Sequence, residues 1–491
     1  MSNDERYFPP DKKPLLYRLT GAIVRFGLRI FFQKIELRHA GNVPTRGPVL
    51  FVANHPNSIM DALLLGAVTK RKVNYLAHAG LFRWKPMAWF LTNCGVIPVH
   101  RRSDDPDKMD QNVNAFAACY ERLEAGEAIG IFPEGTSDML RKVKKVKTGA
   151  ARILLETEAR NGYDLCVNLL PVGLHFFSRS RFRSRVLVNF GEPVPLVKLF
   201  TKYADDPSDG VRALTDEIQA RLEALTVNIR EDELDRFVRE IEFLYRDELK
   251  STDASKSTVE EFVITQKIAE CVQYYQDHRP ELVAEMRERI TEYRRKLDKL
   301  RLRDAVLRDG DSKATITRDM VRVIGMGLLG LPLALYGAIN NVIPYLISEG
   351  FARMFLHERT KILTALLIGG GLAFVFFFAA QIVFVAQFVS WPWATLYGIS
   401  LPLSGFFALA YMQLMRKYRQ RISFSFLLFT NKHLVIKMRR QRKSLIAAMN
   451  QVRDEYLSML AKRRAGVLQT SQMGFPTRNQ TAATDFSDYT D

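Results

Sequence analysis

Residues 54–61, NHPNSIMD, place a histidine and an aspartate six positions apart, directly after an apolar run. On a continuous helix this spacing turns through about 240°, so the two side chains would not share a face. We therefore expect His55 in a loop and Asp61 on the following helix, reaching back to the imidazole. A carboxylate bound to one imidazole nitrogen leaves the other free to accept a proton. No G-x-S-x-G motif supplies a nucleophile, so such a base would act directly on a substrate hydroxyl; a purely structural pair is the alternative.

A second polar segment, FPEGTS, begins at residue 132, where the apolar run AIGIF ends. A glutamate at a buried strand end costs free energy unless it meets a polar partner. Glu134, Gly135, Thr136 and Ser137 are therefore candidate substrate-binding residues. An ordinary link from a strand to a turn is the alternative.

Two cationic positions could bind an anion. Arg101 and Arg102 follow the run GVIPVH, and a guanidinium presents a fork of donors that suits phosphate oxygens. A surface pair bridged to a nearby aspartate is the alternative. Lys147 stands just before an expected helix start, where helix amide groups and a cation together favour an anion. The other basic residues of LRKVKKVKTG are expected to be solvated.

The elements that would position these residues alternate between short apolar runs and helical patterns. The runs are rich in β-branched residues, as buried strands are: PVLFVAN, KVNYLA, GVIPVH, AIGIF, NLLPVGL and RVLVNF. Helical segments separate several of them, which predicts an α/β fold with a central, largely parallel sheet flanked by helices. In such sheets, sites collect at the carboxyl ends of the strands, where the three polar segments lie.

Four segments in this order resemble the sequence blocks of the glycerophospholipid acyltransferase family. NHPNSIMD matches the first block, GVIPVHR the second, FPEGTS the third and LLPVGL the fourth, over about 150 residues. The resemblance implies acyl transfer from an acyl-CoA or acyl carrier protein thioester to a hydroxyl of a phosphorylated glycerol, with no further cofactor and no metal. It implies that His55 is the general base, Asp61 its orienting partner and Arg101 a phosphate binder, with Glu134 and Gly135 in the acceptor site.

One departure from the family pattern bears on the acceptor. The common pattern has four residues between the histidine and the aspartate, whereas this chain has five, PNSIM. The branch of eukaryotic glycerol-3-phosphate/dihydroxyacetone-phosphate acyltransferases is similar in this spacing and in the later FRSRVLVNFGEP. Glycerol 3-phosphate is therefore the expected acceptor. A 1-acylglycerol-3-phosphate acceptor and a non-catalytic lipid-binding scaffold are the alternatives.

The net charge of +18 must be balanced by an anionic partner. No nucleic-acid-binding signature accompanies the charge, while long uncharged segments do, so membrane lipids are the expected partner and nucleic acid is not. The N-terminal pattern places apolar residues and arginines on different faces of one helix, which is typical of a helix in the membrane interface. An amphipathic helix packed on its own domain is the alternative.

The expected organisation follows from these patterns. Segments 362–389 and 391–415 are each long enough to cross a bilayer and predict a hairpin with tryptophans at its turn. Segment 323–348 is uncharged but interrupted by Pro and Asn, and a re-entrant path keeps the basic flanks on one side. The catalytic domain is expected to face the cytoplasm, at a bacterial inner membrane or an endoplasmic reticulum. The expected parts are an interface helix at 1–36, an acyltransferase α/β domain at 37–209, a charged α-helical insert at 210–315, a membrane region at 316–420, a basic helical segment at 421–465 and a disordered tail at 466–491.

Overall fold

The computed structural model describes residues 8, 11–100, 107, 110, 112–137, 140–179, 181–249, 258–300, 302, 304, 307, 313–354 and 362–472. The chain divides into two compact units. The first comprises residues 1–228, 257–263 and 340–401, and the second comprises 229–256, 264–339 and 402–491.

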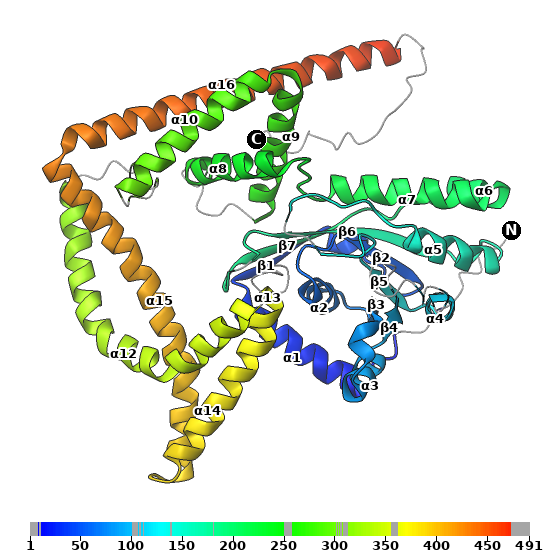
Figure 1. Cartoon of the computed structure of the whole chain (residues 1–491), viewed down its shortest axis with the longest axis horizontal. Coiled ribbons are helices and arrows are strands. Elements are labelled where there is room, and N and C mark those ends of the chain that lie inside the picture. Colours follow the sequence, from blue (N-terminus) through cyan, green and yellow to red (C-terminus); the bar gives the residue numbers. More distant parts are fainter. Residues whose placement is uncertain are drawn as a thin grey trace. The chain divides into compact units, whose positions relative to one another are not determined.

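A seven-stranded sheet forms the centre of the first unit in the part of the chain that is described (Figure 1). Its strands are β1 (Lys34–Arg38), β2 (Val49–Ala53), β3 (Val73–His78), β4 (Val96–Val99), β5 (Ala128–Ile131), β6 (Asn168–Phe176) and β7 (Arg185–Phe190). They lie in the order β1-β7-β6-β2-β5-β3-β4, and all neighbours are parallel except β6 and β7. The expected largely parallel sheet is confirmed. β1 was not expected.

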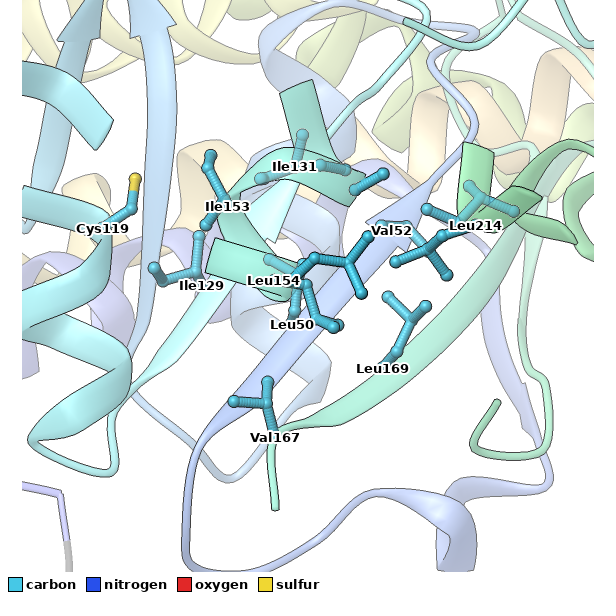
Figure 2. Close-up of a cluster of buried hydrophobic side chains, with 14 of the residues drawn as sticks. Leu50, Val52, Cys119, Ile129, Ile131, Ile153, Leu154, Val167, Leu169 and Leu214 are labelled. Atoms are coloured by element: carbon cyan, nitrogen blue, oxygen red, sulfur yellow. The ribbon is translucent and has the colours of Figure 1, made fainter. Parts of the chain in front are cut away.

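Helices cover both faces of the sheet, as the apolar runs require. The first unit contains α1 (Leu15–Phe31), η1 (Ala40–Asn42), α2 (Ile59–Val68), η2 (Ala79–Phe82), α3 (Lys85–Asn93), α4 (Asn112–Glu124), α5 (Gly149–Arg160), α6 (Val197–Asp205) and α7 (Pro207–Ala224). Successive residues of a strand point to opposite faces, and β2 shows the consequence. Leu50 and Val52 pack against α4, α5 and α7 (Figure 2), while Val49, Phe51 and Ala53 pack against α1 and α2. The helical layer on one face of the sheet therefore includes α7, so the α/β domain extends beyond residue 209, where it was expected to end.

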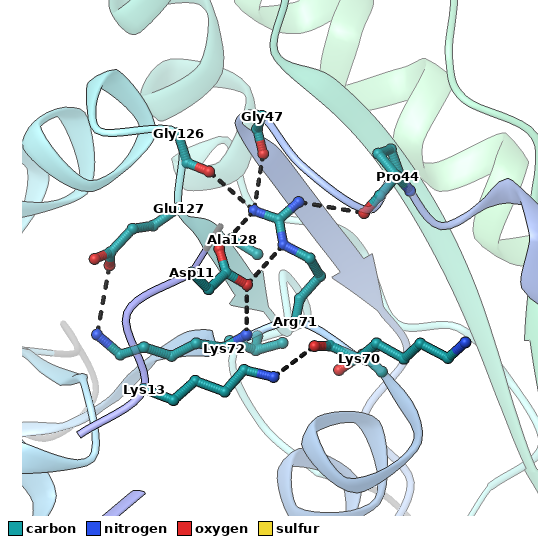
Figure 3. Close-up of polar contacts among 12 residues, drawn as sticks. Asp11, Lys13, Pro44, Gly47, Lys70, Arg71, Lys72, Gly126, Glu127 and Ala128 are labelled. Carbon is teal, nitrogen blue, oxygen red and sulfur yellow. Dashed lines mark hydrogen bonds and ion pairs between the residues drawn. The ribbon is translucent and has the colours of Figure 1, made fainter. Parts of the chain in front are cut away.

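A buried arginine fixes the amino ends of several strands (Figure 3). Arg71 donates to both carboxylate oxygens of Asp11, at 2.7 and 2.9 Å, and to the carbonyls of Pro44, Gly47 and Gly126. Multiple hydrogen bonds of this kind are needed to keep a buried guanidinium stable. This cluster connects the segment before α1 to the amino ends of the strands, and the candidate site lies at their carboxyl ends.

Three helices in the described residues are long and apolar enough to cross a membrane: Gly327–Met354, Ile362–Val385 and Trp391–Arg416. The first lies in α12 (Lys313–Met354), the second comprises α13 (Ile362–Ala365), the π-helical turn η5 (Leu366–Gly370) and α14 (Gly371–Val385), and the third begins α15 (Trp391–Thr430). The membrane hairpin expected at 362–415 corresponds to the second and third of these helices, and its crossing of a bilayer stays a prediction. Helix α12 runs without a break through its prolines, and the re-entrant path of 323–348 stays a prediction.

Polar side chains join these helices where they belong to the first unit. The Tyr397 hydroxyl lies 2.7 Å from Asn340 Oδ1 and 2.8 Å from Gln381 Oε1, and Gln381 donates to the Asn340 carbonyl. Gly369 and Gly370 lie against Phe351 and Ser348 of α12. Because they have no side chain, these glycines allow close helix packing.

The second unit is helical in its described residues. It contains α8 (Asp232–Leu249), most of α9 (Thr258–His278), α10 (Pro280–Lys299) and α16 (Lys432–Gln472). Buried Asp304 accepts hydrogen bonds from Arg442 of α16 and from the hydroxyl of Tyr293 of α10. The expected tail from 466 begins inside α16, and 473–491 lies outside the described residues.

Candidate active site

His55 and Asp61 form the pair that their spacing suggested. Nδ1 of His55 lies 2.9 Å from Oδ2 of Asp61, and the same oxygen accepts the backbone N–H of Asn57 at 2.7 Å. His55 lies in the loop after β2, and Asp61 lies in the first turn of α2. Ser58 has a φ of 52° just before α2 begins at Ile59, a backbone conformation that is uncommon for residues other than glycine. Ser58, the residue before α2, forms no side-chain hydrogen bond that caps the helix.

The Asp61 carboxylate is fully buried. Burial raises the pKa of Asp61, and the hydrogen bonds from His55 and Asn57 oppose this rise. A carboxylate that accepts from Nδ1 holds the imidazole in the tautomer whose Nε2 carries a lone pair. Nε2 of His55 is therefore the ring nitrogen that can accept a proton.

An aromatic stack fixes the face of the imidazole. The rings of His55 and Phe132 stack at 4.3 Å with an interplanar angle of 20°, and Tyr75 stacks behind Phe132 at 6.2 Å. Phe132 directly follows β5, which is the neighbour of β2. The sequence interpretation treated Phe132 only as part of a buried strand. Its place two residues before Glu134 was the available signal.

Glu134 braces the chain that carries His55. Its Oε1 accepts the backbone N–H of His55 at 2.9 Å, and its Oε2 accepts the backbone N–H of Lys144 at 3.1 Å. Only 5% of the residue is exposed. Burial raises the pKa of Glu134, and the two amide hydrogen bonds oppose the rise. The polar partner that a buried glutamate needs is thus supplied by the protein's own backbone.

Asn54 fastens the other side of the same loop. Its side chain donates to the Leu174 carbonyl at 3.1 Å and accepts the Leu174 N–H at 2.7 Å. This pairing extends the contact between β2 and β6 to the residue before His55. The sequence interpretation gave Asn54 no role.

Gly135 and Thr136 of the FPEGTS segment contact residues other than His55. The N–H of Gly135 donates to the Phe132 carbonyl, so a turn already uses this donor. The Thr136 hydroxyl accepts from Lys144 Nζ at 3.3 Å, and Ser137 is half-buried. The ammonium of Lys147 lies over Gly135, where a Cβ would come within 2.6 Å of it.

The pocket at this site contains different cations from those that the sequence indicated. His55 and Glu134 line it together with Arg141, Lys142 and Arg179. Arg179 follows β6, which is the other neighbour of β2, and it donates to the Leu140 carbonyl at 3.1 Å. Thr136, Ser137 and Lys147 are not among the residues that line this pocket.

Arg101 lies outside the described residues, as does Arg102. Strand β4, which precedes them, is at the edge of the sheet, three strand positions from β2. At about 4.8 Å per position, the end of β4 is about 14 Å from the end of β2. The loops after β2, β5 and β6 are nearer to one another.

The site places an imidazole that could transfer a proton in a pocket lined by cationic side chains. An oriented imidazole can remove a proton from a hydroxyl, and guanidinium groups bind phosphate oxygens. Among the described residues, no group of three or more His, Cys, Asp or Glu side chains is arranged to hold a metal ion.

Comparisons with known proteins agree with this geometry. Residues 34–174 match the family model described as Acyltransferase. The chain is 25% identical over 335 residues to glycerol-3-phosphate O-acyltransferase 1 of Saccharomyces cerevisiae, a match that covers 50% of this chain and 44% of that protein. It is 33% identical over 123 residues to glycerol-3-phosphate O-acyltransferase 2 of the same yeast, covering 25% of this chain and 16% of the relative. The chain thus spans less than half the length of these relatives.

Two further similarities concern 1-acylglycerol-3-phosphate acyltransferases. The chloroplastic enzyme LPAT1 of Arabidopsis thaliana is 28% identical over 127 residues, which cover 26% of this chain and 34% of that protein. The crystal structure of the 1-acyl-sn-glycerophosphate acyltransferase PlsC of Thermotoga maritima covers 40% of this chain and 80% of that chain, at 22% identity and a TM-score of 0.29. On the family match, residues 34–174 of this chain are an acyltransferase-family domain.

Proposed function

We propose that this protein transfers a fatty acyl group from an acyl thioester to a hydroxyl of glycerol 3-phosphate, producing a lysophosphatidate for phospholipid synthesis. The observation that carries the proposal is the His55–Asp61 pair, at 2.9 Å, on a pocket that two arginines also line. The acyltransferase-family match over 34–174 and the similarity to yeast glycerol-3-phosphate acyltransferases support the same reaction and acceptor.

The proposed mechanism uses His55 twice. Nε2 removes the proton of the acceptor hydroxyl while its oxygen attacks the thioester carbonyl, a contribution of about 10²- to 10⁴-fold. The tetrahedral intermediate then expels the thiolate, which takes the proton back from the imidazolium. No acyl-enzyme is required, because the donor already carries a good leaving group. Asp61 keeps Nδ1 bound throughout and stabilises the imidazolium that forms.

The phosphate of the acceptor is proposed to bind Arg141 and Arg179. Both line the pocket that His55 lines, and an anchored phosphate turns the encounter of two substrates into a positioned reaction. Glu134, in this proposal, holds the His55 backbone in place. The proposed roles of Arg101 and Lys147 in phosphate binding stay predictions.

The catalytic domain is proposed to face the cytoplasm, on a bacterial inner membrane or an endoplasmic reticulum. Basic residues at the ends of the apolar helices, Arg353 in the first and Arg416 in the third, support this orientation through the positive-inside tendency.

The test is an acceptor panel with purified full-length protein in detergent. Two donors are offered, each with a labelled acyl group: acyl-CoA and the acyl thioester of acyl carrier protein. Each donor is combined in turn with glycerol 3-phosphate, dihydroxyacetone phosphate or lysophosphatidate. Product is expected with glycerol 3-phosphate, and His55→Ala is expected to abolish it while His433→Ala, in α16, leaves it unchanged. Product with lysophosphatidate alone would favour the second candidate acceptor, which the LPAT1 similarity supports. No product with any acceptor would favour a lipid-binding scaffold.

A further inference from the structure

Helix α1 has two apolar faces, and the domain covers only one of them. Leu28 and Phe31 are buried in the core beside α2 and Ala53. A second stripe lies at spacings of four, four and three residues, which is one face of a helix, and it is exposed: Leu15, Leu19, Ile23 and Phe26. The two alternatives for this segment, packing on its own domain and facing the membrane interface, are therefore compatible with each other.

The segment η2–α3 exposes a second apolar set next to α1. Its exposed members are Leu81, Trp84, Met87 and Trp89, with the two tryptophans 65% and 63% exposed. Thr20 of α1 lies close to Cys94, the residue that follows α3, and Figure 1 shows the two helices beside one another on the same side of the sheet. We call these eight exposed residues of α1, η2 and α3 the α1–α3 surface.

An apolar helix long enough to span a membrane begins against the carboxyl-terminal end of α1. Leu363 of α13 is fully buried in the core cluster that contains Leu28 and Phe31. Leu367 packs on Gly27, where a Cβ would touch its methyl group at 3.4 Å. The domain and the start of this helix are thus one packed structure, and the helix leaves the domain beside α1.

The length of that helix sets where its far end lies. Ile362–Val385 has 24 residues, or about 36 Å of helix, which exceeds the roughly 30 Å hydrocarbon core of a bilayer. Trp391 and Trp393 follow the turn at its far end, and both are exposed, at 63% and 65%. Tryptophan is enriched at the two levels where a membrane protein meets the headgroups.

We propose that the α1–α3 surface lies in the headgroup layer of the membrane that α14 crosses. Trp84 and Trp89 then anchor the near interface, and Trp391 and Trp393 anchor the far one. Exposed cations flank the surface and suit anionic lipid headgroups, at about 1 kcal/mol for each basic group near the membrane: Arg18, Arg25, Arg29, Arg83 and Lys85. The lipid bilayer is the favoured occupant, because the spanning helix forces it to begin next to α1.

The four tryptophans of the chain allow a direct test. The full-length double variant Trp391→Phe/Trp393→Phe keeps only Trp84 and Trp89 as indoles, and Trp84→Phe/Trp89→Phe keeps only the far pair. Each is reconstituted into vesicles of phosphatidylcholine and phosphatidylglycerol, in which the phosphatidylcholine is brominated either near the headgroup or near the chain ends. Bromine is present in both leaflets, so the orientation of insertion does not affect the result.

Emission from Trp84 and Trp89 is expected to be quenched by shallow bromine as strongly as emission from Trp391 and Trp393, less by deep bromine, and little by aqueous iodide. The far pair is the internal reference for a membrane-interface position. Quenching of Trp84 and Trp89 by iodide but not by bromine would show that the surface faces water and would overturn the proposal. Insensitivity to both quenchers would show that another protein surface covers these tryptophans, which also overturns it.

Discussion

The carboxylate of Glu134 accepts the backbone N–H of His55 at 2.9 Å, so the residue that follows one strand fixes the loop that follows its neighbour. This contact separates two possible roles for the glutamate. If Glu134 binds the substrate, its loss would weaken the affinity for the acceptor. If Glu134 only holds the His55 loop, its loss would displace the base.

Glu134→Gln is expected to lower kcat about ten- to hundredfold with little change in the KM for glycerol 3-phosphate. Glutamine offers one carbonyl oxygen where two backbone N–H groups need acceptors, and a buried donor left unpaired costs about 1–3 kcal/mol. Initial rates measure both constants, with exposed Glu121→Gln of α4 as the control. A raised KM with an unchanged kcat would assign Glu134 to the acceptor instead.

Asp61→Asn is expected to lower kcat at least about a hundredfold and to raise the melting temperature at pH 7. Burial raises the pKa of Asp61, so its favourable contribution to stability is complete below the unfolded value of about 3.9 and is lost as the pH rises through the folded pKa. Wild type therefore carries the cost of a buried carboxylate at pH 7, and the variant does not.

Thermal unfolding in detergent across a pH series checks this opposition of stability and activity. The difference in melting temperature is expected to shrink as the pH falls toward 4, since wild-type Asp61 then takes up its proton. A lower melting temperature for the variant at pH 7 would mean that the hydrogen bonds of Asp61 to His55 and Asn57 outweigh the cost of burial.

The sequence predicted those parts of the fold and site that depend on local pattern. Strands buried on both faces, such as β2, are continuously apolar and could be recognised from the sequence. The position of His55 in the loop after β2 followed from its spacing to Asp61. Strand β1, KIELR, was missed because only apolar runs were interpreted as strands, although its alternating polar and apolar residues are the pattern of a half-buried edge strand.

The parts that were missed depend on the order of strands in space. Arg179 is 124 positions from His55 along the chain, and β6 lies beside β2 only once the sheet has formed. Lys147 had the better local signal, a cation before a helix, yet it lies over Gly135. The stack of Phe132 on His55 likewise depends on β5 being the other neighbour of β2.

Arg179→Gln is expected to raise the KM for glycerol 3-phosphate about ten- to hundredfold, because a hydrogen bond to a charged group contributes about 1.5–3 kcal/mol. The KM for acyl-CoA is expected to stay the same. Exposed Arg181→Gln, two residues away, is the matched control. If the KM for acyl-CoA rises instead, Arg179 binds the phosphates of the donor.

Asp11→Ala is expected to destabilise the protein without changing kcat per folded molecule. Asp11 pairs with buried Arg71 and accepts the Lys72 N–H at the sheet edge opposite His55, and removing one partner of a buried ion pair costs about 3–5 kcal/mol. At about 2–4 °C per kcal/mol, the melting temperature should fall by roughly 6–20 °C, while Lys12→Ala, an exposed neighbour, should leave it unchanged.

The double variant Asp11→Ala/Arg71→Met should recover part of the loss, since it leaves no unpaired buried charge. A double variant as unstable as Asp11→Ala would show that the bonds from Arg71 to the carbonyls of Pro44, Gly47 and Gly126, and not its pairing with Asp11, hold these strands together.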